Sequence, residues 1–61
     1  MPSVTVDAIE GRTIEQKRGL VKDITEAVVN NFKVGPESVS IHIVEYSREN
    51  IAKAGVLLQD K

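Results

Sequence analysis

Hydrophobic and polar residues alternate at the start of the chain and again beyond its middle. Between residues 3 and 9, Val4, Val6 and Ala8 occupy every second position, and polar residues stand between them. A period of two over this length predicts a half-buried β-strand, and valine and threonine favour one. A second alternation of aliphatic residues over residues 39–44 predicts another strand.

The segment between the two predicted strands repeats its apolar residues every three or four positions. These residues are Ile14, Leu20, Val21, Ile24, Ala27, Val28 and Phe32. The period is that of an amphipathic helix, which we predict from about residue 14 to about residue 31. Thr13 and Gln16 have the spacing at which two side chains cap a helix start reciprocally. Gly35 and Pro36 end the helical segment and turn the chain.

The order of strand, long helix and strand predicts an α/β fold made of one β-α-β unit. Its two strands should run parallel, with a right-handed crossover. The tail from Ile51 to Leu58 is apolar and is interrupted by Ala54 and Gly55. It predicts a short C-terminal hairpin or an arm that joins a neighbour's sheet. No linker or repeat divides the chain, so residues 1–61 are expected to form a single domain.

The size of the chain makes a partner subunit necessary. A chain of 61 residues buries only about 60% of the surface that its unfolded form exposes, and such small folds need a disulfide, a metal or a partner. The chain has no cysteine, and His42 is its only histidine, so we expect no metal site. One helix covers one face of a sheet, whereas parallel sheets are covered on both. We therefore expect an oligomer.

Charge and composition argue against two classes of function. The net charge is −1, with acids and bases mixed along the chain, and Phe32 and Tyr46 are the only aromatic residues. Nucleic-acid binders carry basic patches and stacking aromatics, so no nucleic-acid partner is expected. No apolar run approaches the roughly 20 residues of a membrane span, and no signal peptide is recognisable. Together with the absence of cysteine, these features favour a cytoplasmic protein without a membrane partner.

The first two residues, Met1 and Pro2, hold the candidate chemistry. Initiator methionine is generally removed before a small residue, and its removal leaves Pro2 with a free secondary amine. The pKa of an α-amino group is about 7.7–8.0, and burial or a nearby cation lowers it. General acid–base catalysis requires a base with a pKa near the working pH. Many chains begin with Met-Pro without a catalytic role, so Pro2 alone does not establish one.

Pro2 belongs to an ordered set of features along the chain. A strand follows it, then the turn Glu10-Gly11-Arg12, a helix that opens with Glu15-Gln16-Lys17, a second strand ending in Val44-Glu45, and a tail that contains glycine. Over nearly the whole chain, this set resembles the 4-oxalocrotonate tautomerase family. The resemblance implies a β-α-β fold with a C-terminal hairpin, assembled from dimers and typically into homo-hexamers, as a trimer of dimers.

The resemblance also implies an activity. Members of that family are isomerases that use no metal or organic cofactor. Their amino-terminal proline moves a proton in the keto–enol tautomerisation of small unsaturated 2-hydroxy or 2-oxo dicarboxylates such as 2-hydroxymuconate. By position, Pro2 would be the general acid/base. Arg12 would bind a substrate carboxylate in a site shared between subunits, a role that suits the two-pronged guanidinium.

Two positions depart from the family's pattern. Ser40 stands where the best-studied members carry a second arginine, which stabilises the charge that develops on the substrate. Serine offers one neutral hydrogen bond, which is far weaker than a charge-assisted one, and losing such a donor commonly costs about 10²–10³ in turnover. Ile51 stands where those members carry a phenylalanine that forms a wall of the site. A different substrate or a weaker activity therefore stays open.

Other functions also stay open at this point. One is another proline-dependent reaction, such as hydration, dehalogenation or decarboxylation, in which Asp7 or Glu45 could activate water. Another is a weakly active or non-catalytic subunit of a hetero-oligomer whose partner supplies the missing arginine. An unrelated interaction module would be indicated by a stable monomer. His42, Arg48 and Lys53 are candidates to replace the missing cation, although such residues more often pack or are solvated.

Overall fold

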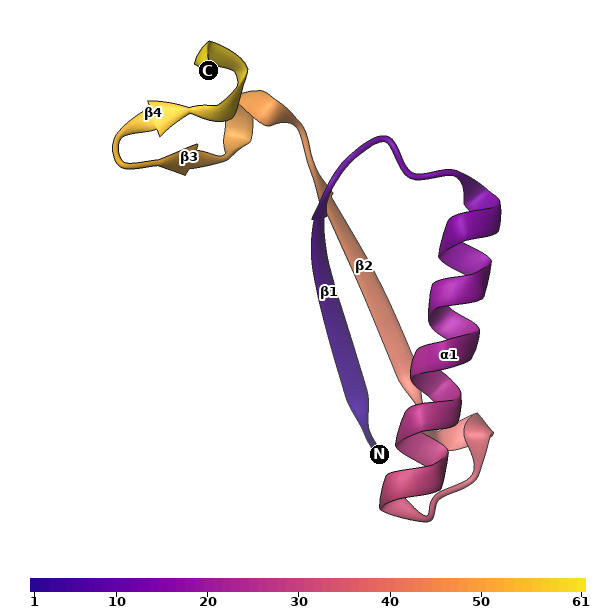
Figure 1. The fold of residues 1–61 in the computed structure, drawn as a ribbon. Helices are drawn as coiled ribbons and strands as arrows, with labels where there is room; N and C mark the ends of the chain where they lie inside the picture. The colour runs from indigo at the N-terminus through magenta and orange to yellow at the C-terminus, as the bar shows by residue number, and fades with distance from the viewer.

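The computed structural model describes all of residues 1–61. Its elements in chain order are β1 (Ser3–Ile9), α1 (Ile14–Phe32), the 3-10 turn η1 (Pro36–Ser38), β2 (Ser40–Tyr46), η2 (Arg48–Asn50), β3 (Ala52–Lys53), β4 (Val56–Leu57) and η3 (Leu58–Asp60). Strands β1 and β2 pair in parallel, and β3 and β4 pair antiparallel. The predicted β-α-β unit and C-terminal hairpin are confirmed (Figure 1).

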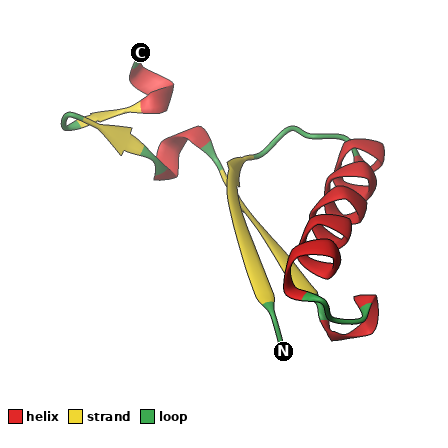
Figure 2. Ribbon diagram, turned by 60° about the horizontal axis from the view of Figure 1, so that its bottom comes forward, coloured by secondary structure: helices red, strands yellow, loops and turns green.

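The two long strands form a sheet whose faces differ. Helix α1 lies along one face, while the hairpin projects from the far end of the sheet, away from the helix (Figures 1 and 2). On the helix side, Val4 is opposite Ile41 and Val6 is opposite Ile43, and all four are half-buried. The other face carries exposed residues: Ser3, Thr5 and Asp7 of β1, and Ser40, His42 and Val44 of β2. The helix therefore covers one face only.

Helix α1 begins where the capping residues predicted it. The backbone N–H of Gln16 donates to Thr13 Oγ1 at 3.1 Å, and the backbone N–H of Thr13 donates to Gln16 Oε1 at 2.8 Å. These two bonds satisfy N–H groups that the first turn of a helix leaves without partners. The helix ends one residue later than predicted, at Phe32, because Lys33 turns the chain with a left-handed backbone, φ 58°.

The predicted apolar stripe of α1 is only partly covered by the sheet. Val21, Ile24 and Val28 are half-buried against the sheet, as expected. Ile14 and Phe32, by contrast, are 55% and 66% exposed. Leu20, at 39%, and Ala27 are also exposed, although Leu20 lines the hollow between the helix and the sheet. Within one protomer, the sheet therefore covers only part of the apolar stripe.

The chain has no fully buried residue and an extended shape. None of its 61 residues is buried within one protomer. Its radius of gyration is 14.8 Å, whereas a compact domain of this length has about 10 Å. The difference comes from the projecting hairpin, in which Ala54 and Gly55 both have positive φ, as a two-residue type I′ turn requires. No helix combines the length and apolarity needed to cross a membrane.

Candidate functional site

The start of the sheet holds Pro2 and Ser40. Pro2 immediately precedes β1, and its carbonyl oxygen accepts a hydrogen bond of 3.0 Å from the backbone N–H of Ser40, the first residue of β2. Pro2 is half-buried, whereas Met1 is 92% exposed. The proline is therefore held against the neighbouring strand, while the methionine that precedes it is packed against nothing that would hinder its removal.

Arg12 and Ile51 lie at the other end of the sheet. Arg12 is in the turn after β1, where Gly11 adopts φ 118°, a conformation that favours glycine. Ile51 follows η2, just beyond β2. Seven residues of β1 separate the two ends, which is roughly 20 Å at about 3.3 Å per residue. The four predicted site residues thus form two separate groups within one protomer.

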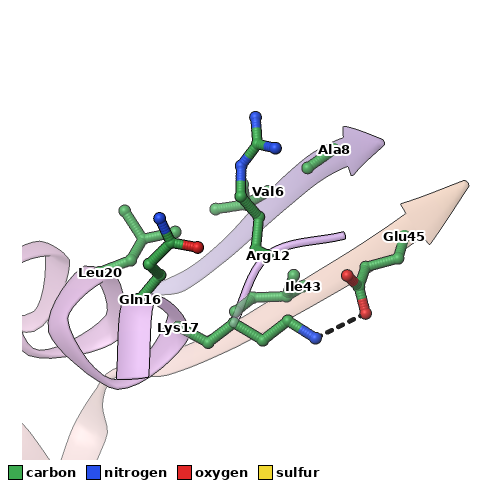
Figure 3. A pocket seen from close by; sticks show the side chains of 8 residues that line it. All are labelled: Val6, Ala8, Arg12, Gln16, Lys17, Leu20, Ile43 and Glu45. Carbon is green, nitrogen blue, oxygen red and sulfur yellow. Dashed lines mark hydrogen bonds and ion pairs between the residues drawn. The ribbon is translucent and has the colours of Figure 1, made fainter. Parts of the chain in front are cut away.

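Arg12 lines a hollow of about 320 Å³ between the start of α1 and the sheet (Figure 3). The hollow is lined by Val6, Ala8, Arg12, Gln16, Lys17, Leu20, Ile43 and Glu45. Within it, Lys17 Nζ and Glu45 Oε1 form an ion pair of 2.7 Å, with side chains 28% and 32% exposed. Arg12 takes part in no ion pair with the chain's own carboxylates. Its guanidinium is therefore available to an external anion.

Sequence reasoning did not find the pair between Lys17 and Glu45. The signal was present in the second strand, where Ile41, Ile43 and Glu45 occupy alternate positions and so share the helix side. An acidic residue in that row needs a partner from the helix, because a carboxylate set against apolar neighbours is costly without one. The observed strand reaches Tyr46, two residues beyond the prediction, and begins at Ser40 instead of residue 39.

Ile51 lines a second hollow, of about 510 Å³, beside the end of the sheet. Its lining residues are Asp7, Ala8, Ile9, Tyr46, Asn50, Ile51 and Ala52. The hydroxyl of Tyr46 donates a hydrogen bond of 3.2 Å to Asp7 Oδ1. The negative charge of Asp7, and then this hydrogen bond, raise the pKa of Tyr46 above its ordinary value, since both disfavour the phenolate. Arg12 and Ile51 therefore line different hollows in one protomer.

None of the candidate replacement cations lines either hollow. His42 is exposed on the uncovered face of the sheet, opposite Thr5 and on the same side as Ser40. Arg48 in η2 and Lys53 in β3 are exposed and form no ion pair. No three or more of the chain's histidine and carboxylate side chains are grouped so that they could hold a metal ion.

Known proteins share this fold over the whole chain. The family model for tautomerase enzymes matches residues 2–61. The 2-hydroxymuconate tautomerase of Bacillus subtilis (strain 168) is 45% identical over 98% of this chain and 97% of its own. A probable tautomerase of Halalkalibacterium halodurans is 39% identical over the full length of both. The fold and the sequence thus define an enzyme of the tautomerase class. Tautomerases are isomerases.

Solved structures show to which family of tautomerases the chain is similar. A crystal structure described as a homologue of 4-oxalocrotonate tautomerase superposes with a TM-score of 0.93 at 43% identity, covering 98% of both chains. A second such homologue gives a TM-score of 0.95 at 36% identity, covering 100% of this chain and 97% of the other. The chain belongs to the 4-oxalocrotonate tautomerase family, so the resemblance found in its sequence is confirmed.

Proposed function

We propose that this enzyme catalyses the keto–enol tautomerisation of a small unsaturated 2-hydroxy or 2-oxo acid, without a cofactor. Pro2 acts as the general acid/base once Met1 is removed, and Arg12 binds a substrate carboxylate. The observation that carries the proposal is the placement of Pro2 immediately before β1, where it accepts a hydrogen bond from Ser40 and follows an exposed Met1. The 45% identity to a 2-hydroxymuconate tautomerase supports the substrate class.

The proposed reaction needs one base and one anchor. The uncharged amine of Pro2 accepts the proton of the enol hydroxyl, and the resulting ammonium returns a proton to a carbon of the conjugated system, giving the oxo form. The Arg12 guanidinium holds a carboxylate through charge-assisted hydrogen bonds and so orients the substrate. Ser40 offers a neutral hydrogen bond to the oxygen that gains charge. Ile51 supplies an apolar wall, and excluding water there favours the uncharged amine.

This mechanism requires more than one copy of the chain. Pro2 and Ser40 lie at one end of the sheet, and Arg12 and Ile51 lie at the other, so a complete site must combine ends of different subunits. We propose a homo-hexamer built as a trimer of dimers. The absence of any fully buried residue and the projecting hairpin support assembly. A relative at 25% identity is described as a heterohexamer, which makes a mixed assembly the alternative.

The proposed function is tested by comparing the wild type with Pro2→Ala. Intact-mass analysis first establishes whether Met1 has been removed, and the conversion of 2-hydroxymuconate is then followed by ultraviolet absorbance. Losing a general acid/base should lower turnover by roughly 10²–10⁴-fold. Full turnover by Pro2→Ala would contradict the proposal. Analytical ultracentrifugation of the same samples shows whether the chain forms a hexamer by itself, and an active homo-hexamer removes the hetero-oligomer alternative.

Hydration of an unsaturated acid is the second candidate function, and the position of Asp7 favours it. Asp7 lies in the hollow that Ile51 lines, so its carboxylate could activate a water beside the substrate. Glu45, the other candidate base, is instead held by Lys17. Under this alternative, Asp7→Asn should abolish formation of a water-added product, detected by mass, and leave tautomerisation intact. Failure of the wild type to form any such product excludes this candidate.

A further inference from the structure

Arg12 and Glu45 line the same hollow, yet they do not pair. Glu45 lies on the helix side of β2, opposite Ala8, and Arg12 is in the turn that follows β1. An arginine near a carboxylate ordinarily binds it with its two-pronged guanidinium. Here Lys17 binds Glu45 at 2.7 Å instead. Figure 3 shows the Arg12 guanidinium pointing away from the pair of Lys17 and Glu45.

The pair of Lys17 and Glu45 differs from the chain's other ion pair. Arg18 and Glu15 are 3.3 Å apart, with side chains 71% and 77% exposed. The side chains of Lys17 and Glu45 are only 28% and 32% exposed. Exposed pairs contribute little because water screens them, whereas a partly desolvated pair at short distance interacts more strongly. Lys17 is therefore well placed to hold Glu45, and Arg18 and Glu15 provide a matched control on the same helix.

We propose that Lys17 is a positioning residue for substrate binding: by holding Glu45, it keeps the Arg12 guanidinium free to bind a substrate carboxylate. This inference rests on the proposed function, which assigns that role to Arg12. Without Lys17, the Glu45 carboxylate competes with the substrate for Arg12 and repels the incoming anion. The side chains of Arg12 and Glu45 both line one hollow of about 320 Å³, and charges interact most strongly within the screening length, which is about 8 Å at physiological ionic strength. Both effects weaken binding and leave the proton transfer at Pro2 unchanged.

The variant that tests the inference is Lys17→Met, which removes the cation and keeps an unbranched apolar stem. We expect KM for 2-hydroxymuconate to rise roughly 3–10-fold, as suits a partly exposed ion pair, with kcat little changed. In the double variant Lys17→Met/Glu45→Gln, KM should return toward the wild-type value, because the competing carboxylate is gone. Lys17→Arg keeps the cation and should also keep the wild-type KM.

Arg18→Met is the matched control. It removes one positive charge from the same helix, and from an ion pair that is largely solvated. Its KM should equal that of the wild type. An equal rise of KM in Arg18→Met would overturn the inference in favour of a general charge effect. The inference would also be overturned if the double variant had a KM as high as that of Lys17→Met, or if Lys17→Met lost kcat alone. Either result would show that the pair has only a structural role.

A binding measurement separates this inference from the proposed function. Calorimetric titration with adipate, an unreactive six-carbon dicarboxylate, reports carboxylate binding without turnover. We expect its Kd to follow the same order among the Lys17 and Glu45 variants as KM does. If Pro2→Ala keeps full turnover while Kd follows Lys17, the proposed function fails and the inference stands. If Pro2→Ala loses its turnover while Kd and KM do not change with the residue at position 17, the proposed function stands and the inference fails. A folding defect in Lys17→Met would appear as a loss of helical circular dichroism. In that case, the KM and Kd of the double variant Lys17→Met/Glu45→Gln are compared with those of Glu45→Gln, and this comparison decides on the inference.

Discussion

The two ends of the parallel sheet have different chemistry. The start of the sheet carries Pro2 and Ser40, which are joined by a backbone hydrogen bond and neither of which has a charged side chain. The far end carries a dense set of charged or polar groups: Asp7, Arg12, Lys17, Glu45 and Tyr46. Parallel pairing places the starts of both strands together and their ends together. Under the proposed function, one protomer therefore offers a candidate base at one end and a candidate carboxylate anchor at the other, so that neighbouring copies would have to combine them.

The strongest test of this separation mixes two variants of lowered activity. Pro2→Ala should lose roughly 10²–10⁴-fold in turnover, and Arg12→Ala should lose roughly 10–100-fold in kcat/KM, since it removes a charge-assisted hydrogen bond. When the two proteins are unfolded together and refolded as mixed oligomers, activity should reappear. If each site takes the two residues from different subunits, about one quarter of the sites in a random equal mixture are intact.

The control for this experiment mixes the two variants without unfolding, which leaves the oligomers unmixed and should restore nothing. Lys22→Ala, an exposed helix cation outside both hollows, should behave as the wild type throughout. Co-refolded oligomers that stay inactive would mean that Pro2 and Arg12 of the same subunit must serve one site. That outcome would contradict the shared arrangement.

A cation added at the start of the sheet should make the two ends more alike. Ser40→Arg places a guanidinium beside Pro2, where it can form a charge-assisted hydrogen bond to the substrate. Such bonds are roughly twice as strong as neutral ones, so kcat/KM for a dicarboxylate should rise about fivefold to tenfold. Steady-state kinetics measure this change, and Ser40→Ala serves as the control, with a small decrease expected. A decrease in Ser40→Arg would show that Ser40 suits a substrate with less negative charge.

The helix start next to Arg12 should be sensitive to its cap. Thr13→Ala removes the side chain that accepts from Gln16, so the folded state should lose about 1 kcal/mol. The midpoint of urea unfolding, measured at one fixed protein concentration because assembly contributes to stability, should fall accordingly. Thr5→Ala, on the exposed face of β1, controls for the loss of a threonine hydroxyl. An unchanged midpoint in Thr13→Ala would mean that packing alone holds the helix start.

The smallest expected effect concerns the titration of Tyr46. Asp7 raises the pKa of this side chain above its ordinary value of 10.0. Because Tyr46 is the only tyrosine, tyrosinate absorbance against pH reports it directly. Asp7→Asn should lower this pKa toward the ordinary value. The raised pKa means that the interaction stabilises the folded state below about pH 10 and is lost as pH rises through the folded-state pKa. Identical titrations of both proteins would show that the contact is absent in solution.

Much of the local structure could be predicted because its causes lie close together in the chain. The bounds of β1 follow from alternation over residues 3–9, and the start of α1 follows from the reciprocal caps of Thr13 and Gln16. The hairpin turn follows from Ala54 and Gly55. The end of β2 could not be read in the same way. Its last residues include Glu45, whose partner is 28 residues away on the helix.

The sequence by itself determined the order of elements, the family and the identity of the candidate site residues. It determined them because periodicity, caps and turns depend on neighbours, and because the motifs from Pro2 to Glu45 keep their order. Only the tertiary structure decided which apolar residues of α1 face the sheet and which remain free for a partner. It also decided that Pro2 lies beside Ser40 and far from Arg12, and that Lys17 rather than Arg12 binds Glu45. These outcomes depend on how the helix crosses over two parallel strands, which joins residues that local pattern cannot relate.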